Sequence, residues 1–142
     1  MIAPYFADTN VLIYAYDRNA PAKRARARTI MSDLGTRGNL AISTQVLKEF
    51  YSVSTRRLAR PLTPDQARRV VGALVMYPVV IEDIPLIQAA IELSQRDNIS
   101  FWDALIVEAA RRAKAKILYT EDLQDGRDFE GLKVENPFRE QP

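Results

Sequence analysis

The sequence predicts an α/β fold in which helices cover both faces of a mostly parallel sheet. Short apolar segments with strand character alternate along the chain with segments of helical periodicity. The chain has 142 residues, 47% of them hydrophobic, which is enough to bury one sizeable core. We therefore expect a single domain over residues 1–142.

Five short apolar segments are the strand candidates. They are residues 2–7, 40–42, 79–81, 116–120 and 132–134, and we expect the last of them at an edge of the sheet. Asp8 directly follows the first segment, and Glu121 and Asp122 directly follow the fourth. Both of these strands therefore end in acidic residues.

Start and stop signals define the helices between the strands. We expect helices over residues 11–16, 20–34, 44–58, 64–75, 85–96 and 101–114. Gly35 ends the second of them, and Ser100 can cap the last. Thr63 is followed by a proline and, three residues after the cap, by Gln66, which is a well-formed start signal for the fourth helix.

Two residue types are missing, and their absence excludes most catalytic mechanisms. Without cysteine the chain has neither a disulfide framework nor a thiolate metal site. Without histidine it lacks the commonest general base and the commonest zinc ligand. Carboxylates remain as the main metal-binding groups, and they suit hard cations such as Mg²⁺ or Mn²⁺.

The sequence shows no sign of a membrane segment or a signal peptide. It has no run of about 18 apolar residues, and residues 1–5 lack the basic start and apolar stretch of a signal sequence. We therefore expect a cytoplasmic protein without a membrane partner.

Positive charge is concentrated in the middle of the chain. Residues 18–69 carry a net charge of +9, whereas residues 1–17 carry −2 and residues 70–142 carry −5. Arg56, Arg57 and Arg60 lie in the densest part of the basic segment. Such a segment fits the electrostatic footprint of a polyanion, but solvated helix faces would have the same composition, so both interpretations stay open.

Two acids occupy positions where ligands bind in open α/β sheets, beyond the carboxyl ends of strands. Asp8 ends the first predicted strand, and Asp122 comes two residues after the fourth. An aspartate after a strand also commonly caps a helix or forms an Asx-turn, which would explain either residue taken alone.

Two further acids share a helix face with apolar side chains. Glu49 lies three residues after Val46, and Asp103 lies three residues before Ile106. A buried carboxylate costs several kcal/mol unless it is paired, hydrogen-bonded or bound to a cation. Asp103 also lies three residues after Ser100, where it could instead close a capping box.

Together the four acids predict a metal site. Four carboxylates in one cleft repel each other strongly unless divalent cations neutralise them. A cation held by carboxylates can activate water for attack on a phosphodiester without any histidine. That chemistry agrees with both the missing histidine and the basic middle of the chain.

At these acids the chain resembles the PIN domain and, within that family, the bacterial and archaeal VapC toxins. The matching segments are Asp8-Thr9-Asn10-Val11-Leu12-Ile13-Tyr14, Val46-Leu47-Lys48-Glu49-Phe50-Tyr51, Phe101-Trp102-Asp103-Ala104-Leu105-Ile106 and Thr120-Glu121-Asp122-Leu123. The resemblance implies a three-layer sandwich with a parallel sheet of about five strands, and a Mg²⁺- or Mn²⁺-dependent endoribonuclease. It also implies the toxin of a type II toxin–antitoxin system, inhibited by a cognate antitoxin, and commonly a homodimer.

The resemblance also assigns roles to individual residues. Asp8, Glu49, Asp103 and Asp122 would form the catalytic quartet, and Asp8, Asp103 and Asp122 would bind the metal. Thr9, Asn10 and Thr120 would support them, with Asp125 as an alternative or addition to Asp122. Apart from the resemblance, the basic middle of the chain makes Arg56, Arg57 and Arg60 the candidates to contact the RNA. A homodimer interface could use residues 11–16 and 46–53, which could equally be core.

Other functional classes fit the sequence less well. A haloacid dehalogenase phosphatase needs a second aspartate two residues after Asp8, where this chain has Asn10. A receiver domain needs an early acidic pair and a lysine after a late strand, whereas Lys114 and Lys116 precede the strand. The alternative that remains is a non-catalytic RNA- or protein-binding module with the same fold.

Overall fold

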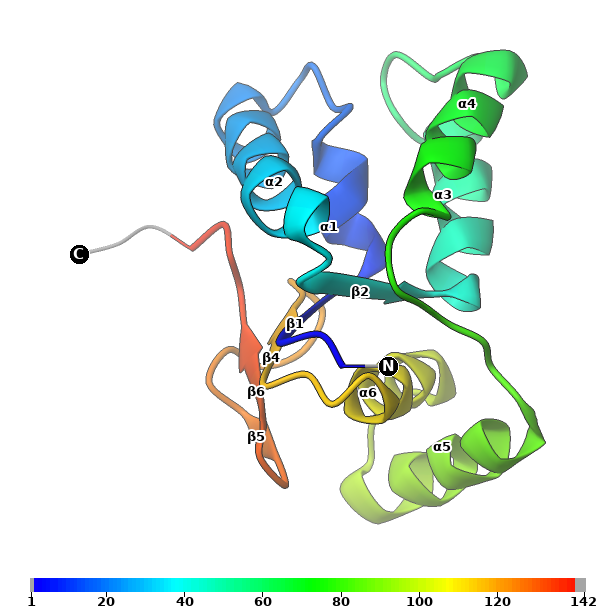
Figure 1. Ribbon diagram of the computed structural model, residues 1–142, viewed down its shortest axis with the longest axis vertical. Coiled ribbons are helices and arrows are strands. Elements are labelled where there is room, and N and C mark those ends of the chain that lie inside the picture. Colours follow the sequence, from blue (N-terminus) through cyan, green and yellow to red (C-terminus); the bar gives the residue numbers. More distant parts are fainter. Residues whose placement is uncertain (1, 140–142) are drawn as a thin grey trace.

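The computed structural model describes residues 2–139, which include one six-stranded sheet (Figure 1). The strands are β1 (Tyr5–Ala7), β2 (Leu40–Ser43), β3 (Val79–Val80), β4 (Ile117–Tyr119), β5 (Asp128–Phe129) and β6 (Leu132–Glu135). They lie in the order β3-β2-β1-β4-β6-β5. All neighbours are parallel except the pair β5 and β6. The predicted α/β fold with a mostly parallel sheet is confirmed.

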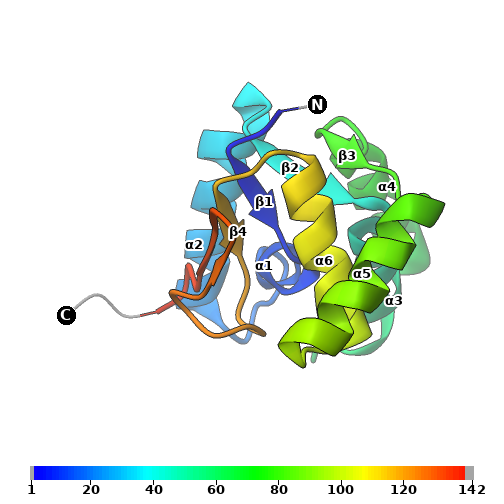
Figure 2. The ribbon, with the colours of Figure 1, turned by 90° about the horizontal axis from the view of Figure 1, so that it is seen from below.

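Helices cover the sheet from two sides. They are α1 (Thr9–Tyr14), α2 (Pro21–Leu34), the short 3-10 helix η1 (Gly35–Arg37), α3 (Thr44–Arg56), α4 (Pro64–Leu74), α5 (Ile84–Asp97) and α6 (Phe101–Arg112). In Figure 1, α1 to α4 lie above β2 and α5 and α6 lie below it, and Figure 2 shows α6 in front of the strands. The predicted three-layer sandwich is confirmed. None of the helices within residues 2–139 is long and apolar enough to span a bilayer.

The start of α4 shows how closely the local sequence signals are followed. Thr63 Oγ1 accepts a hydrogen bond of 3.1 Å from the backbone N of Gln66, and Gln66 Oε1 accepts one of 2.9 Å from the backbone N of Thr63. Both halves of the predicted capping box are therefore present.

The sheet has one strand more than the expected number, and the extra strand is β5. It pairs with β6 across a two-residue turn, in which Glu130 and Gly131 have φ angles of 53° and 98°. Positive φ at both central residues is typical of the tight turns that join antiparallel strands. Because β5 occupies the edge, the prediction that residues 132–134 form an edge strand is wrong: β6 lies between β4 and β5.

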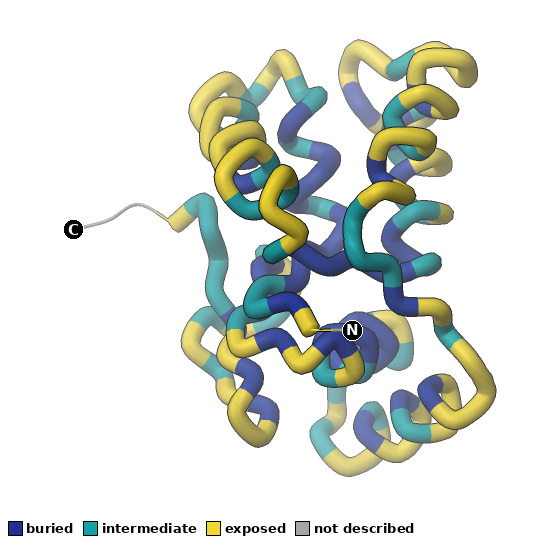
Figure 3. Tube along the Cα trace, in the orientation of Figure 1, coloured by how far each residue is buried: buried dark blue, intermediate teal, exposed yellow. Residues whose placement is uncertain are grey.

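The core lies between the sheet and the helix faces that pack on it (Figure 3). Its largest fully buried side chains are Phe6, Phe50, Leu12, Leu40, Ile42, Leu74, Leu86, Leu93, Leu118, Leu132, Val11 and Val46. Four of these, Val11, Leu12, Val46 and Phe50, belong to residues 11–16 and 46–53. Of the two interpretations left open for those segments, core and homodimer interface, the structure supports core.

Candidate active site

The candidate site begins where two neighbouring strands end. β1 and β4 pair in parallel with Ala7 opposite Tyr119, so Asp8 and Thr120 lie side by side at the carboxyl edge of the sheet. Thr120 Oγ1 donates a hydrogen bond of 2.8 Å to Asp8 Oδ2. The backbone N of Asp8 donates to Tyr119 O at 3.0 Å. Strand pairing thus brings together two residues that are 112 positions apart in the sequence.

Asp8 is the most buried acid among residues 2–139, with 6% of its surface exposed. It caps α1 by accepting a hydrogen bond of 2.7 Å from the backbone N of Thr9. Burial raises the pKa of its carboxyl from 3.8 to about 7; hydrogen bonds from Thr120 and Thr9 lower it, and the charges of Asp122 and Glu49 raise it further. Within the described residues, no lysine or arginine pairs with this carboxyl. The capping role is therefore present, and it leaves a buried acid without a cationic partner.

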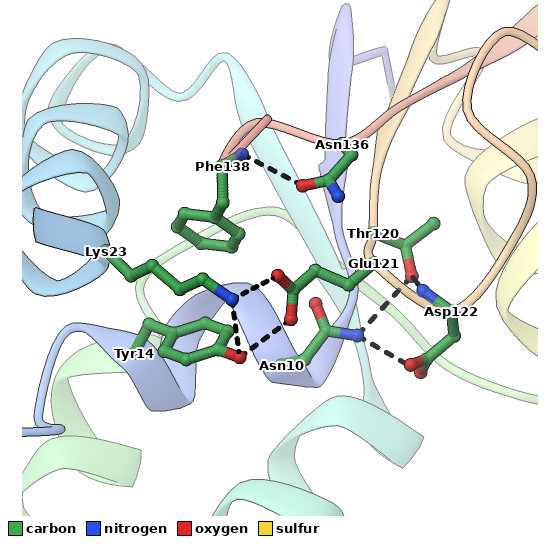
Figure 4. A network of polar contacts seen from close by, with 8 residues as sticks. All are labelled: Asn10, Tyr14, Lys23, Thr120, Glu121, Asp122, Asn136 and Phe138. Carbon is green, nitrogen blue, oxygen red and sulfur yellow. Dashed lines mark hydrogen bonds and ion pairs between the residues drawn. The ribbon is translucent and has the colours of Figure 1, made fainter. Parts of the chain in front are cut away.

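Asn10 connects Asp8 to Asp122, and Figure 4 shows its contacts with Thr120 and Asp122. Its Nδ2 donates to Asp122 Oδ2 at 3.1 Å and lies 3.4 Å from Thr120 Oγ1 and 3.5 Å from Asp8 Oδ2. The reversed amide would place a carbonyl oxygen against two carboxylates, so the acids fix its orientation. Asn10 Oδ1 is buried and has no hydrogen-bond partner among residues 2–139. It is therefore an unsatisfied buried acceptor, of the kind that ordered water commonly satisfies in proteins.

Asp122 is the neighbour that the other three acids share. Its backbone N donates to Thr120 Oγ1 at 3.0 Å, which fixes the start of the segment after β4. Burial is the main cause of the raised pKa of Asp8, Glu49 and Asp103, and the negative charge of Asp122 raises all three further. The structure therefore brings the four predicted acids together around Asp122.

Glu49 and Asp103 reach the cluster from α3 and α6, which lie on opposite sides of the sheet. Glu49 Oε1 accepts a hydrogen bond of 3.4 Å from Thr9 Oγ1. The backbone N of Asp103 donates to Ser100 Oγ at 3.0 Å, so Ser100 caps α6 as predicted. Both acidic side chains are only partly buried, in contrast to Asp8. Glu49 borders a cavity that Asp8 and Asp122 also line, whereas Asp103 is not among its lining residues.

The cluster borders a cavity of about 380 Å³. Asp8, Asn10, Glu49 and Asp122 line it, and Arg57 is the basic residue at its wall. The donors are oxygen atoms, which Mg²⁺ and Mn²⁺ prefer. As the side chains stand, no three acids within residues 2–139 are close enough to hold one ion jointly. The donor chemistry therefore fits a hard cation, and joint coordination requires side chains such as the exposed Asp122 to turn.

Asp125 does not face the cluster in the way that Asp122 does. Its Oδ1 accepts a hydrogen bond of 2.8 Å from the backbone N of Asn136, and its Oδ2 lies 2.6 Å from Arg139 Nη1. Both carboxylate oxygens thus hold the chain after β6. Of the two residues that the sequence left open as the fourth acid, Asp122 is the one beside Asn10 and Thr120.

The three arginines expected to contact RNA lie in different surroundings. Arg57 lines the cavity beside the acids. Arg56 lines a separate hollow together with Tyr51 and Pro64. Arg60 is exposed in the loop before α4. Arg57 is therefore the arginine best placed to contact a ligand bound at the acids.

The sequence did not indicate a second polar network beside the acids, formed by Tyr14, Lys23 and Glu121 (Figure 4). Lys23 Nζ lies 2.7 Å from Glu121 Oε2, and Tyr14 OH donates to Glu121 Oε1 at 2.8 Å. Glu121 directly precedes Asp122 in the sequence, and this position is the local signal that could have identified Glu121 as part of the site. Its partners are 98 and 107 residues away in the sequence, and no local pattern identifies them.

Comparisons with known proteins agree with this architecture. Residues 5–127 match the family model of the PIN domain. A search of curated proteins found no match. A toxin–antitoxin complex from Klebsiella pneumoniae is similar in structure, with a TM-score of 0.70, 20% identity, and coverage of 94% of this chain and 97% of that chain.

Two further solved structures are similar at the same level of identity. One is VapC20 from Mycobacterium tuberculosis, a toxin that cleaves the Sarcin-Ricin loop, with a TM-score of 0.66, 20% identity, and coverage of 83% of this chain and 89% of that chain. The other is DNA-bound VapBC from Salmonella typhimurium, with a TM-score of 0.61, 20% identity, and coverage of 95% and 98%. The family model and these shared folds confirm the resemblance seen in the sequence, and the chain belongs to the PIN-domain family.

Proposed function

We propose that this chain is a cytoplasmic endoribonuclease that depends on Mg²⁺ or Mn²⁺ and acts as the toxin of a type II toxin–antitoxin pair. The observation that carries the proposal is the convergence of Asp8, Glu49, Asp103 and Asp122 at the carboxyl edge of the sheet. Asp8 is buried there with a raised pKa and without a basic partner among the described residues. A divalent cation would supply the missing positive charge.

Asp8, Asp103 and Asp122 are the residues that would bind the cation, and Glu49 would complete the acidic site. When bound, a divalent cation activates water as a nucleophile and offsets negative charge on a phosphodiester. The chain itself contributes the fixed orientation of these carboxylates. Thr120 Oγ1 holds Asp8, and Thr9 Oγ1 holds Glu49, at 2.8 Å and 3.4 Å respectively.

RNA would reach the acids through the cavity that Asp8, Glu49 and Asp122 line. Arg57 lies at the wall of this cavity, where its guanidinium can pair with a backbone phosphate near the bound segment. Arg56 and Arg60 would contact phosphates further along the strand.

A cognate antitoxin is the proposed protein partner, and complexes of this kind are found among the similar structures. An acidic site without a basic partner would accept an arginine or lysine from such a protein. We also propose a homodimer. Because Val11, Leu12, Val46 and Phe50 of the segments 11–16 and 46–53 are core, we place the dimer contact on another surface. The exposed isoleucines of α5, Ile84, Ile87 and Ile91, offer an apolar one.

Cleavage of total cellular RNA by the purified, antitoxin-free protein tests the proposal. Reactions contain Mg²⁺ or Mn²⁺, and parallel reactions contain EDTA or the Asp8→Asn variant. We expect discrete products that require both the metal ion and Asp8. Sequencing the product ends would then identify the substrate and the cleaved bond.

A matched control is Asp33→Asn, which removes the same charge from an exposed position on α2. It should cleave as the unmodified protein does. Cleavage that persists in EDTA or in Asp8→Asn would contradict a metal-dependent mechanism at this site. No cleavage by folded protein that binds RNA would favour the non-catalytic binding module.

A further inference from the structure

Lys23, Glu121 and Tyr14 form a closed network next to the acidic cluster (Figure 4). Lys23 Nζ lies 2.7 Å from Glu121 Oε2 and donates a hydrogen bond of 3.2 Å to Tyr14 OH. Tyr14 OH in turn donates to Glu121 Oε1 at 2.8 Å. Each carboxylate oxygen of Glu121 therefore has its own donor. The network joins α1, α2 and the segment that follows β4.

The network is packed as well as hydrogen-bonded. Lys23 Nζ lies 4.6 Å from the centre of the Tyr14 ring, and the Phe138 ring packs edge-on against Tyr14 with centroids 4.8 Å apart. The side chains of Lys23 and Glu121 are 40% and 22% exposed. An isolated surface ion pair contributes little to stability. Here, however, two donors and two packed rings restrict where Glu121 can lie.

Glu121 stands between the two residues of its segment that reach the acidic cluster. The Thr120 hydroxyl donates to Asp8 and accepts from the backbone N of Asp122. In Figure 4 the Glu121 side chain extends toward Lys23 and Tyr14, whereas Asp122 lies on the side of Asn10. Fixing the Glu121 side chain therefore fixes the backbone from which Asp122 projects.

Asp122 needs this support more than the other acids do. It is exposed, and it carries the negative charge that acts on Asp8, Glu49 and Asp103 at once, so the same three acids repel it. Its side-chain contact within the cluster is the hydrogen bond of 3.1 Å from Asn10 Nδ2. The contacts of Glu121 with Lys23 and Tyr14, on the opposite side of this backbone, counteract the repulsion.

We propose that Lys23 is a positioning residue that holds Asp122 in the acidic cluster through Glu121, without contacting RNA or the cation itself. This inference rests on the proposed function, because it concerns how the same site is kept ready for a cation. The alternative role for a partly exposed lysine beside a nuclease site is direct contact with an RNA phosphate.

Mn²⁺ binding measured by isothermal titration calorimetry, without RNA, separates these roles. The variants are Lys23→Met, Glu121→Gln and the double variant. Charge alone predicts that removing the lysine strengthens Mn²⁺ binding and that removing the glutamate weakens it. Positioning predicts that both weaken it, by about tenfold, as losses of outer-shell partners of metal ligands commonly do. Because the two side chains act as one unit, the double variant should bind no more weakly than either single variant.

Two further variants serve as controls. Lys133→Met removes the same charge from an exposed position on β6, and its Mn²⁺ affinity should stay unchanged or rise slightly. Lys23→Arg keeps a cation that can reach Glu121 and should restore most of the affinity. Circular dichroism checks that each variant is folded, and Glu121→Gln tests the inference independently because it preserves the volume of the side chain.

The outcomes distinguish this inference from the proposed function. Unchanged or tighter Mn²⁺ binding by Lys23→Met overturns the positioning role. Weaker RNA binding by Lys23→Met in EDTA, with Glu121→Gln unaffected, would instead assign the lysine to the RNA. If the unmodified protein binds no Mn²⁺, or if Asp8→Asn binds it equally well, the metal site fails and the inference fails with it.

Discussion

Replacing Asp8 by asparagine should stabilise the metal-free protein at alkaline pH. The pKa of this carboxyl is about 7 in the folded protein, mainly because of burial, against an ordinary value of 3.8. Between pH 4 and pH 7 the folded chain therefore binds more protons than the unfolded chain, so stability falls as the pH rises through this range. Above pH 7 the folded protein carries the full cost of a buried negative charge.

The size of the effect follows from the pKa difference. A shift from 3.8 to about 7 corresponds to about 4 kcal/mol between the protonation states. The side-chain oxygen of asparagine can still accept the hydrogen bond from the Thr9 backbone N. The other carboxylate oxygen, which accepts from Thr120 Oγ1, is replaced by an NH2 group, and the lost hydrogen bond costs about 1–2 kcal/mol. We expect Asp8→Asn to raise the free energy of unfolding by about 2–3 kcal/mol at pH 8. At pH 5, where the folded carboxyl is already protonated, the gain should be about zero.

Urea denaturation in EDTA at pH 5 and pH 8 measures both values. Asp33→Asn on the exposed face of α2 is the control, and its effect should be small at either pH. A destabilised Asp8→Asn at pH 8, or a gain of the same size at both pH values, would refute the electrostatic argument. With excess Mn²⁺ the unmodified protein should become more stable than Asp8→Asn, because the cation stabilises only the protein that binds it.

Three other predictions concern the cluster, the core and the RNA path. Burial is the main cause of the raised pKa of Asp103, and the charge of Asp122 is a smaller cause. Asp122→Asn should therefore lower the pKa of Asp103 in a carbon-13 NMR titration. An unchanged pKa would mean that the two acids are too far apart to interact. Phe50→Ala removes a fully buried ring and should reduce the free energy of unfolding by about 3–5 kcal/mol in urea denaturation; a loss under 1 kcal/mol would contradict the burial. Arg57→Gln should weaken RNA binding and reduce its salt slope by about 1, with Mn²⁺ affinity in calorimetry unchanged; an unchanged salt slope would show that this arginine contacts no phosphate.

The parts of the fold that the sequence predicted well are those specified locally. The Thr63 capping box needs only residues 63–66, and the structure contains both of its hydrogen bonds. The positions of Asp8 and Asp122 could be predicted because parallel strands end at one edge of the sheet, whatever the details of pairing.

The parts that could not be predicted depend on distant partners or on turn geometry. The choice between Asp122 and Asp125 rests on how the chain turns after β4, and spacing along the sequence does not determine that direction. The pairing of Lys23 with Glu121 spans 98 residues and has no local signature. The strand β5 consists of Asp128 and Phe129, so it contains a single apolar residue and no apolar run to recognise, whereas the equally short β3 lies in the apolar run 79–81.

The short strands at the two edges of the sheet limit how this protein can associate. The outermost strands, β3 and β5, are each two residues long, so they expose few backbone groups for pairing with another chain. At β5 the Arg127 guanidinium also lies 4.5 Å from the centre of the Phe129 ring. Continuous growth of the sheet from one molecule to the next is therefore disfavoured. Contacts between folded copies would then be made by helices and loops, and the free protein should resist aggregation through strand addition.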